Sequence, residues 1–397
     1  MRARANETGI GRAPWGVLGV ALVSQIGISV VDQGIPGLTG FIKADLGWSS
    51  AAVGAMVSSF TFGRMFGSYA AGLAADRVGE RSVLIAGGVT TGALIGLASI
   101  SPLPGLIALL VLAGMASAAS TPAGGRLVLM AFPPRRRGFA LGVRQTGIPI
   151  GGLVAAAILP RLAHESSWRW SLALAGALAA VAVIPLAVSG VRGVDVPDPS
   201  DRHPRTSPAR DRNVRLLTIW GCLVVSGQYA VLAFFALDLH RSAGLSLAGA
   251  SLLLAVAQGS GVVGRVAWGA ISDRALSRGR KPLLLVLTAV GLVGTLALLG
   301  TPRSAPVAVL GLVAALTGIA LIGYQGLWVT MIAEAAGPGR AGAATGFGVT
   351  FIAGAIALSP PFYGLVADLA GTYRAIWAVL AGILVVAFVP AALVRER

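Results

Sequence analysis

A short signature occurs twice in this chain, each time directly after a long apolar segment. The two copies read Gly72-x-x-x-Asp76-Arg77-x-Gly79-x-Arg81 and Gly269-x-x-Ser272-Asp273-Arg274. Asp273 lies 197 residues after Asp76, which is about half of the 397-residue chain. Self-similarity at a fixed offset indicates a duplicated structure. The chain is therefore expected to fold as two similar halves, each with this loop at the same place.

The composition requires lipid rather than water as the solvent. Hydrophobic residues make up 55% of the chain and charged residues only 12%, with a mean hydropathy of +0.81, whereas about a quarter of the residues of a soluble domain are charged. A spanning helix needs about 20 mostly apolar residues. Such runs lie near residues 14–38, 50–74, 82–101, 104–132, 138–162, 168–191, 214–240, 247–272, 281–301, 305–335, 340–367 and 372–394.

These runs predict an all-α membrane protein with twelve transmembrane helices in two pseudo-symmetric six-helix bundles. The first bundle is expected over residues 1–191 and the second over residues 214–397. Residues 192–213 are rich in proline and charge and almost lack large apolar side chains. This composition is typical of a mobile linker, which we expect to be cytoplasmic.

The net charge of +16 is distributed unevenly among the predicted loops. Most of the 31 Lys and Arg residues fall on one side of the membrane, the side that also carries both ends of the chain. This is the positive-inside bias, and it predicts a protein of the cytoplasmic (inner or plasma) membrane with both termini cytoplasmic. Contact with anionic lipid headgroups follows from it, and no nucleic-acid partner is expected.

The motifs of common enzymes and pumps are missing from the sequence. Neither of the two lysines, Lys43 and Lys281, follows a glycine, so the chain has no phosphate-binding loop for ATP hydrolysis. His164, His203, His240 and the single Cys222 are scattered over different segments. We therefore expect no enzyme activity, no metal site and no cofactor.

Four arginines, Arg64, Arg126, Arg144 and Arg265, lie within apolar segments. Because an ionisable group in lipid costs several kcal/mol unless it faces water or a partner, each needs a reason. Arg265 is predicted to hold an anionic substrate and Arg64 to supply a second charge; the alternative is an ion pair with Asp32, Asp238 or Glu334. Arg126 and Arg144 are predicted to form part of an inner gate; the alternatives are that they reach the headgroups or bind the substrate.

Polar and aromatic residues at similar depth complete the predicted site. Gln25 and Asp32 are seven residues apart, on one face of the first helix, and Gln258 has the same relation to Arg265. The predicted substrate-binding set consists of Arg265, Arg64, Gln25, Asp32, Gln33, Tyr229, Gln258, Tyr324 and Trp328.

Proline interrupts two apolar segments. Pro149 lies in the fifth segment, and Pro360 and Pro361 lie in its counterpart in the second half. Proline removes a backbone donor and bends a helix. Paired broken helices in two repeats predict a central pathway that opens alternately to each side of the membrane.

The repeated loop resembles the defining motif of the major facilitator superfamily of secondary transporters, where it lies between the second and third helices of each half. The resemblance implies that the motif latches the cytoplasmic ends of the halves together. The predicted gating residues are therefore Gly72, Asp76, Arg77, Arg81, Gly269, Asp273 and Arg274, together with Arg126 and Arg144.

A finer resemblance rests on the fourth, fifth and eighth segments. Residues 121–151 look like the corresponding region of monocarboxylate, oxalate:formate and cyanate-type transporters. In the monocarboxylate branch an arginine followed four residues later by glycine binds the substrate carboxylate, and Arg265 and Gly269 match this spacing. The proton-carrying aspartate of that branch is replaced by Gly261 here, which argues against its proton-coupled mechanism.

The sequence thus predicts a secondary transporter that moves a small organic (carboxylate) or inorganic anion by alternating access. A coupling proton or a counter-anion is a possible partner. Two alternatives stay open: a proton-coupled exporter of amphipathic drugs, in which Asp32 titrates, and a non-transporting sensor with the same fold.

Overall fold

The computed structural model describes residues 13–47, 50–189, 207–275, 279–300, 302 and 305–395. Most of the predicted linker 192–213 lies outside these residues. Its last two residues, Arg212 and Asn213, already belong to the first helix of the second half. Asp211 caps that helix, because its carboxylate accepts hydrogen bonds from the backbone N–H groups of Asn213 and Val214.

Helices make up nearly all of the described chain. The first half contains α1 (Ala13–Gly37), α2 (Thr39–Leu46), α3 (Ser50–Val78), α4 (Glu80–Ile100), α5 (Leu103–Ser117), α6 (Ser120–Ala131), α7 (Arg137–Gln145), α8 (Gly147–Glu165), α9 (Trp168–Val181) and α10 (Ile184–Val188). The second half contains α11 (Arg212–Ser242), α12 (Leu247–Arg274), α13 (Lys281–Gly300), α14 (Val307–Thr317), α15 (Gln325–Ala336), α16 (Ala341–Ala370) and α17 (Arg374–Leu393).

Eleven helical stretches of the described chain are long and apolar enough to cross a membrane. The remaining predicted segment, 50–74, forms α3, which has 29 residues but carries Arg64 within its apolar stretch and is not one of the eleven. The short helix α2 was not predicted. An all-helical membrane protein is therefore confirmed, whereas the number of twelve crossings stays a prediction.

Several predicted helices are broken, but not all at the predicted places. The fifth segment breaks at Thr146, between α7 and α8, three residues before Pro149. A continuous helix would use the N–H of residue 149 to bond the carbonyl of Gln145, and proline has none to offer. The predicted bend of this segment is thus confirmed, with its cause.

The sequence also predicted a matching break at Pro360 and Pro361 in the second half, and this prediction was wrong. α16 runs without interruption through Pro360 and Pro361, as a transmembrane helix can where its neighbours hold the backbone in place. The matched breaks lie instead in the fourth and tenth segments. One follows Ser117, between α5 and α6, and the other follows Thr317, where the π-helical turn Gly318–Ile322 separates α14 from α15.

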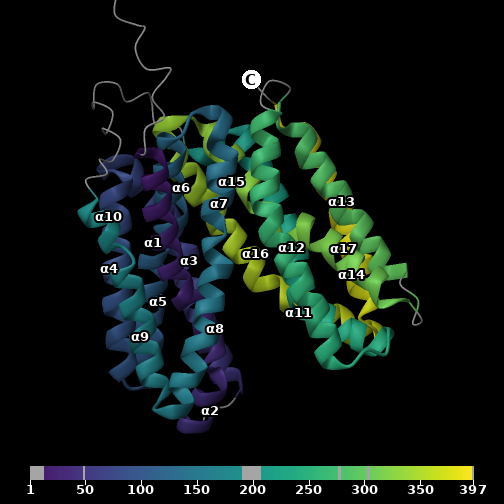
Figure 1. Cartoon of the computed structure of the whole chain (residues 1–397), viewed down its shortest axis with the longest axis horizontal. Helices are drawn as coiled ribbons and strands as arrows, with labels where there is room; N and C mark the ends of the chain where they lie inside the picture. Colours follow the sequence, from purple (N-terminus) through teal and green to yellow (C-terminus); the bar gives the residue numbers. More distant parts are fainter. Residues whose placement is uncertain are drawn as a thin grey trace, which may run out of the picture.

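The two halves lie side by side (Figure 1). They meet toward the end of the molecule that carries the start of α1 and the end of α17, which we call the terminal end, and they diverge toward the opposite end. Two helix crossings join the halves, α3 with α16 and α7 with α12.

Small residues permit both crossings. A Cβ atom added to Gly72 would collide with the carbonyl oxygen of Gly342, and one added to Gly269 would collide with that of Gly138. In lipid, helix association depends on close packing, and glycine permits this approach of two backbones. The two crossings have the same construction, as the internal duplication predicts.

Candidate functional site

At the terminal end, each half holds the other through one aspartate of the repeated signature. The Asp76 carboxylate accepts hydrogen bonds from the N–H groups of Gly342 (3.1 Å) and Ala343 (2.7 Å), at the start of α16. The Asp273 carboxylate accepts from Gly138 and Phe139, both at 2.8 Å, at the start of α7. A helix start offers unbonded N–H groups and positive dipole charge. These two latches hold the halves together.

An arginine and a glutamate support each latch, with their positions exchanged between the halves. In the first half, Arg126 on α6 lies 3.1 Å from Asp76 and also pairs with Glu80 at the start of α4. In the second half, Arg280, just before α13, lies 3.4 Å from Asp273 and 3.3 Å from Glu334 on α15. The arginine is thus on the fourth predicted segment in the first half, whereas in the second half it lies just before the ninth segment, which is equivalent to the third.

Glu80 and Arg280 were not in the predicted gating set, although Gly279-Arg280-Lys281 follows the second copy of the signature. Each directly follows a glycine of the loop, Gly79 or Gly279, with φ of 89° and 85° respectively. A positive φ is available to glycine at little cost and turns the chain sharply into the next helix. The sharp turn places the side chain of the next residue close to the latch that contains the aspartate of the same loop.

The arginines of the signature itself do not join the latch in the structure. Arg77 and Arg274 are exposed. Arg81 donates to the carbonyl oxygens of Ala187 (2.7 Å) and Leu186 (3.3 Å), at the end of α10 in its own half. Of the predicted gating residues, Gly72, Gly269, Asp76 and Asp273 make contacts between the halves, whereas Arg81 and Arg126 pair within the first half.

Away from the latches, Arg64 has a carboxylate partner. Its Nη1 lies 2.6 Å from Oδ2 of Asp32, and Gln33 donates to the same oxygen at 3.1 Å. The two charged side chains are 22% and 17% exposed. Arg64 is therefore paired with Asp32 in this structure, which is the alternative that the sequence left open. Its contact with a substrate stays a prediction.

Arg265 differs from Arg64, because it is buried and its hydrogen bonds within the described part of the chain go to neutral groups. Its Nη1 donates to the carbonyl oxygen of Gln145 at 2.7 Å and its Nε to that of Ile322 at 3.3 Å. The Gln145 carbonyl is the one that Pro149 leaves without a helical donor. Ile322 is the last residue of the π-helical turn in the second half, which also contains Arg265. One guanidinium thus joins two helix breaks, one from each half.

Arg144 is buried, and its hydrogen bonds go to residues of the first half. Its Nη2 donates to Oε1 of Gln25 at 2.8 Å and to the Ser120 carbonyl. Its Nε and Nη1 have no hydrogen-bond partner among the residues described. No carboxylate in the described ranges forms a salt bridge with Arg144 or Arg265.

Tyr229 connects the two groups of charges. It lies near enough to interact electrostatically with Asp32 and Arg64 of the first half and with Arg265 of the second. Gln258, on the same helix as Arg265, is exposed. Asp32, Arg64, Tyr229 and Arg265 therefore gather where α1, α3, α11 and α12 approach one another.

Three predicted site residues are buried, although Tyr324 still lies near enough to interact electrostatically with Arg265 and Tyr229. Trp328 is 3% exposed in the core of the second half, where its indole donates to the Leu217 carbonyl at 2.8 Å. Tyr324 is 1% exposed and packs edge-on against Trp220. Gln25 accepts from Arg144 and Ser120. Trp328 was predicted from depth alone, which cannot distinguish a packed aromatic residue from a cavity wall.

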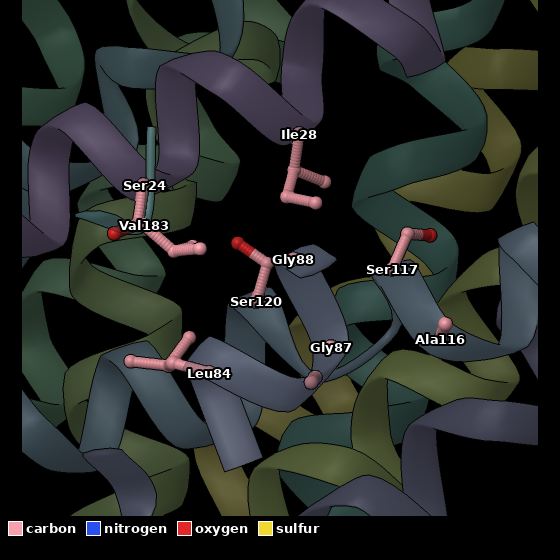
Figure 2. Close-up of a pocket in the computed structure, with 10 residues that line it drawn as sticks. Ser24, Ile28, Leu84, Gly87, Gly88, Ala116, Ser117, Ser120 and Val183 are labelled. Atoms are coloured by element: carbon pink, nitrogen blue, oxygen red, sulfur yellow. The ribbon is translucent and has the colours of Figure 1, made fainter. Parts of the chain in front are cut away.

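A small cavity lies beside the Arg144 network (Figure 2). It is lined by the hydroxyl-bearing residues Ser24, Ser117 and Ser120, together with Gly87 and Gly88. Its volume is about 10 Å³, close to the minimum that one water molecule needs. This cavity is too small for an organic anion, so it is not the substrate site.

Two similar helical bundles, joined by reciprocal latches at one end and carrying buried charges between them, are the architecture of a carrier and not of an enzyme. The sequence profile of the Major Facilitator Superfamily matches residues 17–360. The chain belongs to this superfamily of transporters.

Three relatives give the range of similarity. An uncharacterized MFS-type transporter of Mycobacterium tuberculosis is 31% identical over 402 residues, covering 98% of this chain and 87% of the relative. The hexuronate transporter of Bacillus subtilis is 29% identical over 34% of this chain and 32% of its own length. The sodium-dependent phosphate transport protein 1 of Arabidopsis thaliana chloroplasts is 28% identical over 32% of this chain and 25% of its own length.

The fold has been seen before in solved structures. A crystal structure of the E. coli fucose:proton symporter FucP superposes with a TM-score of 0.73 at 17% identity, over 97% of this chain and 100% of that one. At this identity the likeness shows the shared fold alone.

Proposed function

We propose that the protein is a secondary active transporter of a small organic or inorganic anion, which binds between the halves at Arg265. One observation carries this proposal: Arg265 and Arg144 are buried cations without a carboxylate partner among the described residues. Arg64, by contrast, is already neutralised by Asp32.

The energetics favour an anionic ligand. A buried ion keeps a penalty of several kcal/mol unless another charge compensates for it. The carbonyl and amide oxygens that accept from Arg265 and Arg144 offset the positive charge only in part, since each carries a partial negative charge. An arriving carboxylate or phosphate would supply the missing charge and a planar acceptor for the guanidinium fork. Arg265, which bridges both halves, is the group best placed to report that arrival to each half.

The relatives agree with this class of substrate. The names of two partial relatives specify a hexuronate, which is a carboxylate, and phosphate. The monocarboxylate, oxalate:formate and cyanate-type branch remains the finer assignment that the fourth, fifth and eighth segments favour. Arg265 would hold the anion, and Gln258 and Tyr229 would complete the site from the same half.

The coupling step that we propose uses the Asp32–Arg64 pair. Both side chains are partly exposed, and they lie within electrostatic range of Tyr229. Protonation of Asp32 would release the charge of Arg64 toward the anion. This links proton and anion movement without an aspartate on α12. The same exposed Asp32 is what a proton-coupled drug exporter would use, so the two functions need a direct test.

Alternating access would act through the latches. We propose that the terminal end faces the cytoplasm, so that the latched form is closed on that side and accessible from the opposite one. Anion binding would draw Arg265 away from the Gln145 carbonyl and loosen one contact between the halves. The four N–H bonds to Asp76 and Asp273 would break in the second half of the cycle.

Flux into proteoliposomes tests the function. Purified full-length protein would be reconstituted and assayed with a hexuronate, lactate, inorganic phosphate and a lipophilic cationic dye. We expect saturable uptake of at least one anion, stimulated by an imposed proton gradient, and no dye transport. Dye transport without any anion flux would establish the exporter instead, and no flux of any probe would favour the sensor.

A further inference from the structure

A second charged cavity lies at the terminal end of the second half, away from the proposed transport site. Its volume is about 300 Å³, at the lower end of the range for small-molecule sites. It is formed where the start of α11, the end of α15 and residues 394–395 come together, and its polar lining consists of Asn213, Arg280, Glu334, Arg340 and Arg395.

The described lining of the cavity carries a net positive charge, because three of its residues are arginines and one, Glu334, is a carboxylate. Arg395 is held there, since the Asn213 side chain donates to the Arg395 carbonyl at 2.6 Å and accepts from the Arg395 N–H at 3.0 Å. This pair of hydrogen bonds holds the backbone of Arg395 at the rim. Basic pockets at the ends of transmembrane helices are suited to phosphate groups.

Arg280 connects this cavity to the latch. Its Nη2 lies 3.4 Å from the Asp273 carboxylate and 3.3 Å from the Pro134 carbonyl of the other half, while its Nη1 lies 3.3 Å from Glu334. The same side chain therefore lines the cavity, supports the latch aspartate and reaches across the seam. An anion that engages Arg280 must compete with these three acceptors.

The acids of the two latches differ in exposure. Glu80 is 0% exposed, whereas Glu334 is 24% exposed; the bases Arg126 and Arg280 are both buried, at 2% and 4%. The exchange of acid and base between the halves thus places the acid of the second latch at the cavity, whereas the acid of the first latch is buried. A structural ion pair alone does not require this difference between repeats.

We propose that this cavity binds a phosphate group, from a lipid headgroup or from solution, and that the bound phosphate controls the Asp273 latch. Arg340 and Arg395 hold the phosphate at the rim, and Arg280 turns toward it from Asp273 and Glu334. The hydrogen bonds between Asp273 and the start of α7 are then weakened. Arg137, which lies 3.9 Å from Glu334, forms a closer ion pair with that carboxylate. The site acts on conformation and does not depend on what the transporter carries.

Thermal unfolding of the purified full-length protein tests the site with two probes. One arm titrates inorganic phosphate in detergent, and the other compares phosphatidylcholine vesicles with and without phosphatidylglycerol. We expect a rise in the unfolding temperature in at least one arm, because a ligand that binds only the folded form stabilises it. Arg395→Gln, and Arg340→Gln with it, are expected to weaken the response about tenfold in probe concentration.

Three controls keep this result separate from transport. Arg161→Gln, at an exposed arginine of α8, should respond like the wild type. Arg265→Ala should also keep the response, since Arg265 does not line this cavity. A response to phosphate in detergent identifies a soluble ligand, and a response to phosphatidylglycerol alone identifies a lipid. The proposal is overturned if neither probe acts, if the Arg340→Gln/Arg395→Gln protein responds normally, or if Arg265→Ala alone removes the effect.

Discussion

Arg265→Ala is expected to abolish anion uptake in proteoliposomes, with the rate falling at least about a hundredfold. The substitution removes the charge that compensates the anion, and hydrogen bonds to charged groups contribute about 1.5–3 kcal/mol each. Arg265→Lys should leave partial uptake, because lysine keeps the charge but not the planar fork that pairs with a carboxylate. Initial rates under a fixed anion gradient are the measurement.

The matched control is Arg161→Ala, which removes an exposed arginine of α8 and should transport normally. Arg144→Ala is expected to reduce uptake as well, although its effect includes the loss of the bonds to Gln25 and Ser120. Unchanged uptake in folded Arg265→Ala protein would show that the anion is held elsewhere.

The second large effect is expected at the helix crossings. Gly72→Val and Gly269→Val should each stop transport, because their Cβ atoms would collide with the backbone oxygens of Gly342 and Gly138. Overpacking of this kind costs about 1–3 kcal/mol or more, which disfavours the latched form about tenfold to a hundredfold. Spin-label distances between α3 and α16 should lengthen in both variants.

Gly96→Val is the control for this prediction, since a Cβ atom at Gly96 meets no other atom within 4 Å. It changes a glycine to valine within a membrane helix, as the other two substitutions do. Transport at the wild-type rate by Gly72→Val or Gly269→Val would mean that the close crossings are not needed in the cycle.

Much of the fold was accessible from the sequence for two physical reasons. Apolar runs of membrane length have few alternatives to a spanning helix, because lipid cannot satisfy a bare backbone. The repeated signature then assigned equivalent helices to the two halves. The break at Thr146 followed from the missing N–H of Pro149, whereas α16 shows that a proline does not always interrupt a helix.

The site was harder to predict from the sequence, because the sequence gives the depth of a charged residue in the membrane but not the residues that surround it. Arg64 and Arg265 looked alike, yet Asp32 lies against only one of them. Which helix face meets which depends on the interhelical rotation, and this is set by packing at glycines such as Gly142, against the Arg265 carbonyl. For the same reason Arg144 was assigned to the gate, although it lies against Gln25.

Binding of the transported anion, measured by isothermal titration, tests the central claim most directly. The wild-type protein and Arg161→Ala should bind the anion with equal affinity, whereas Arg265→Ala should bind it at least about a hundredfold more weakly. Wild-type affinity in folded Arg265→Ala protein would contradict the assignment of Arg265 as the group that holds the substrate.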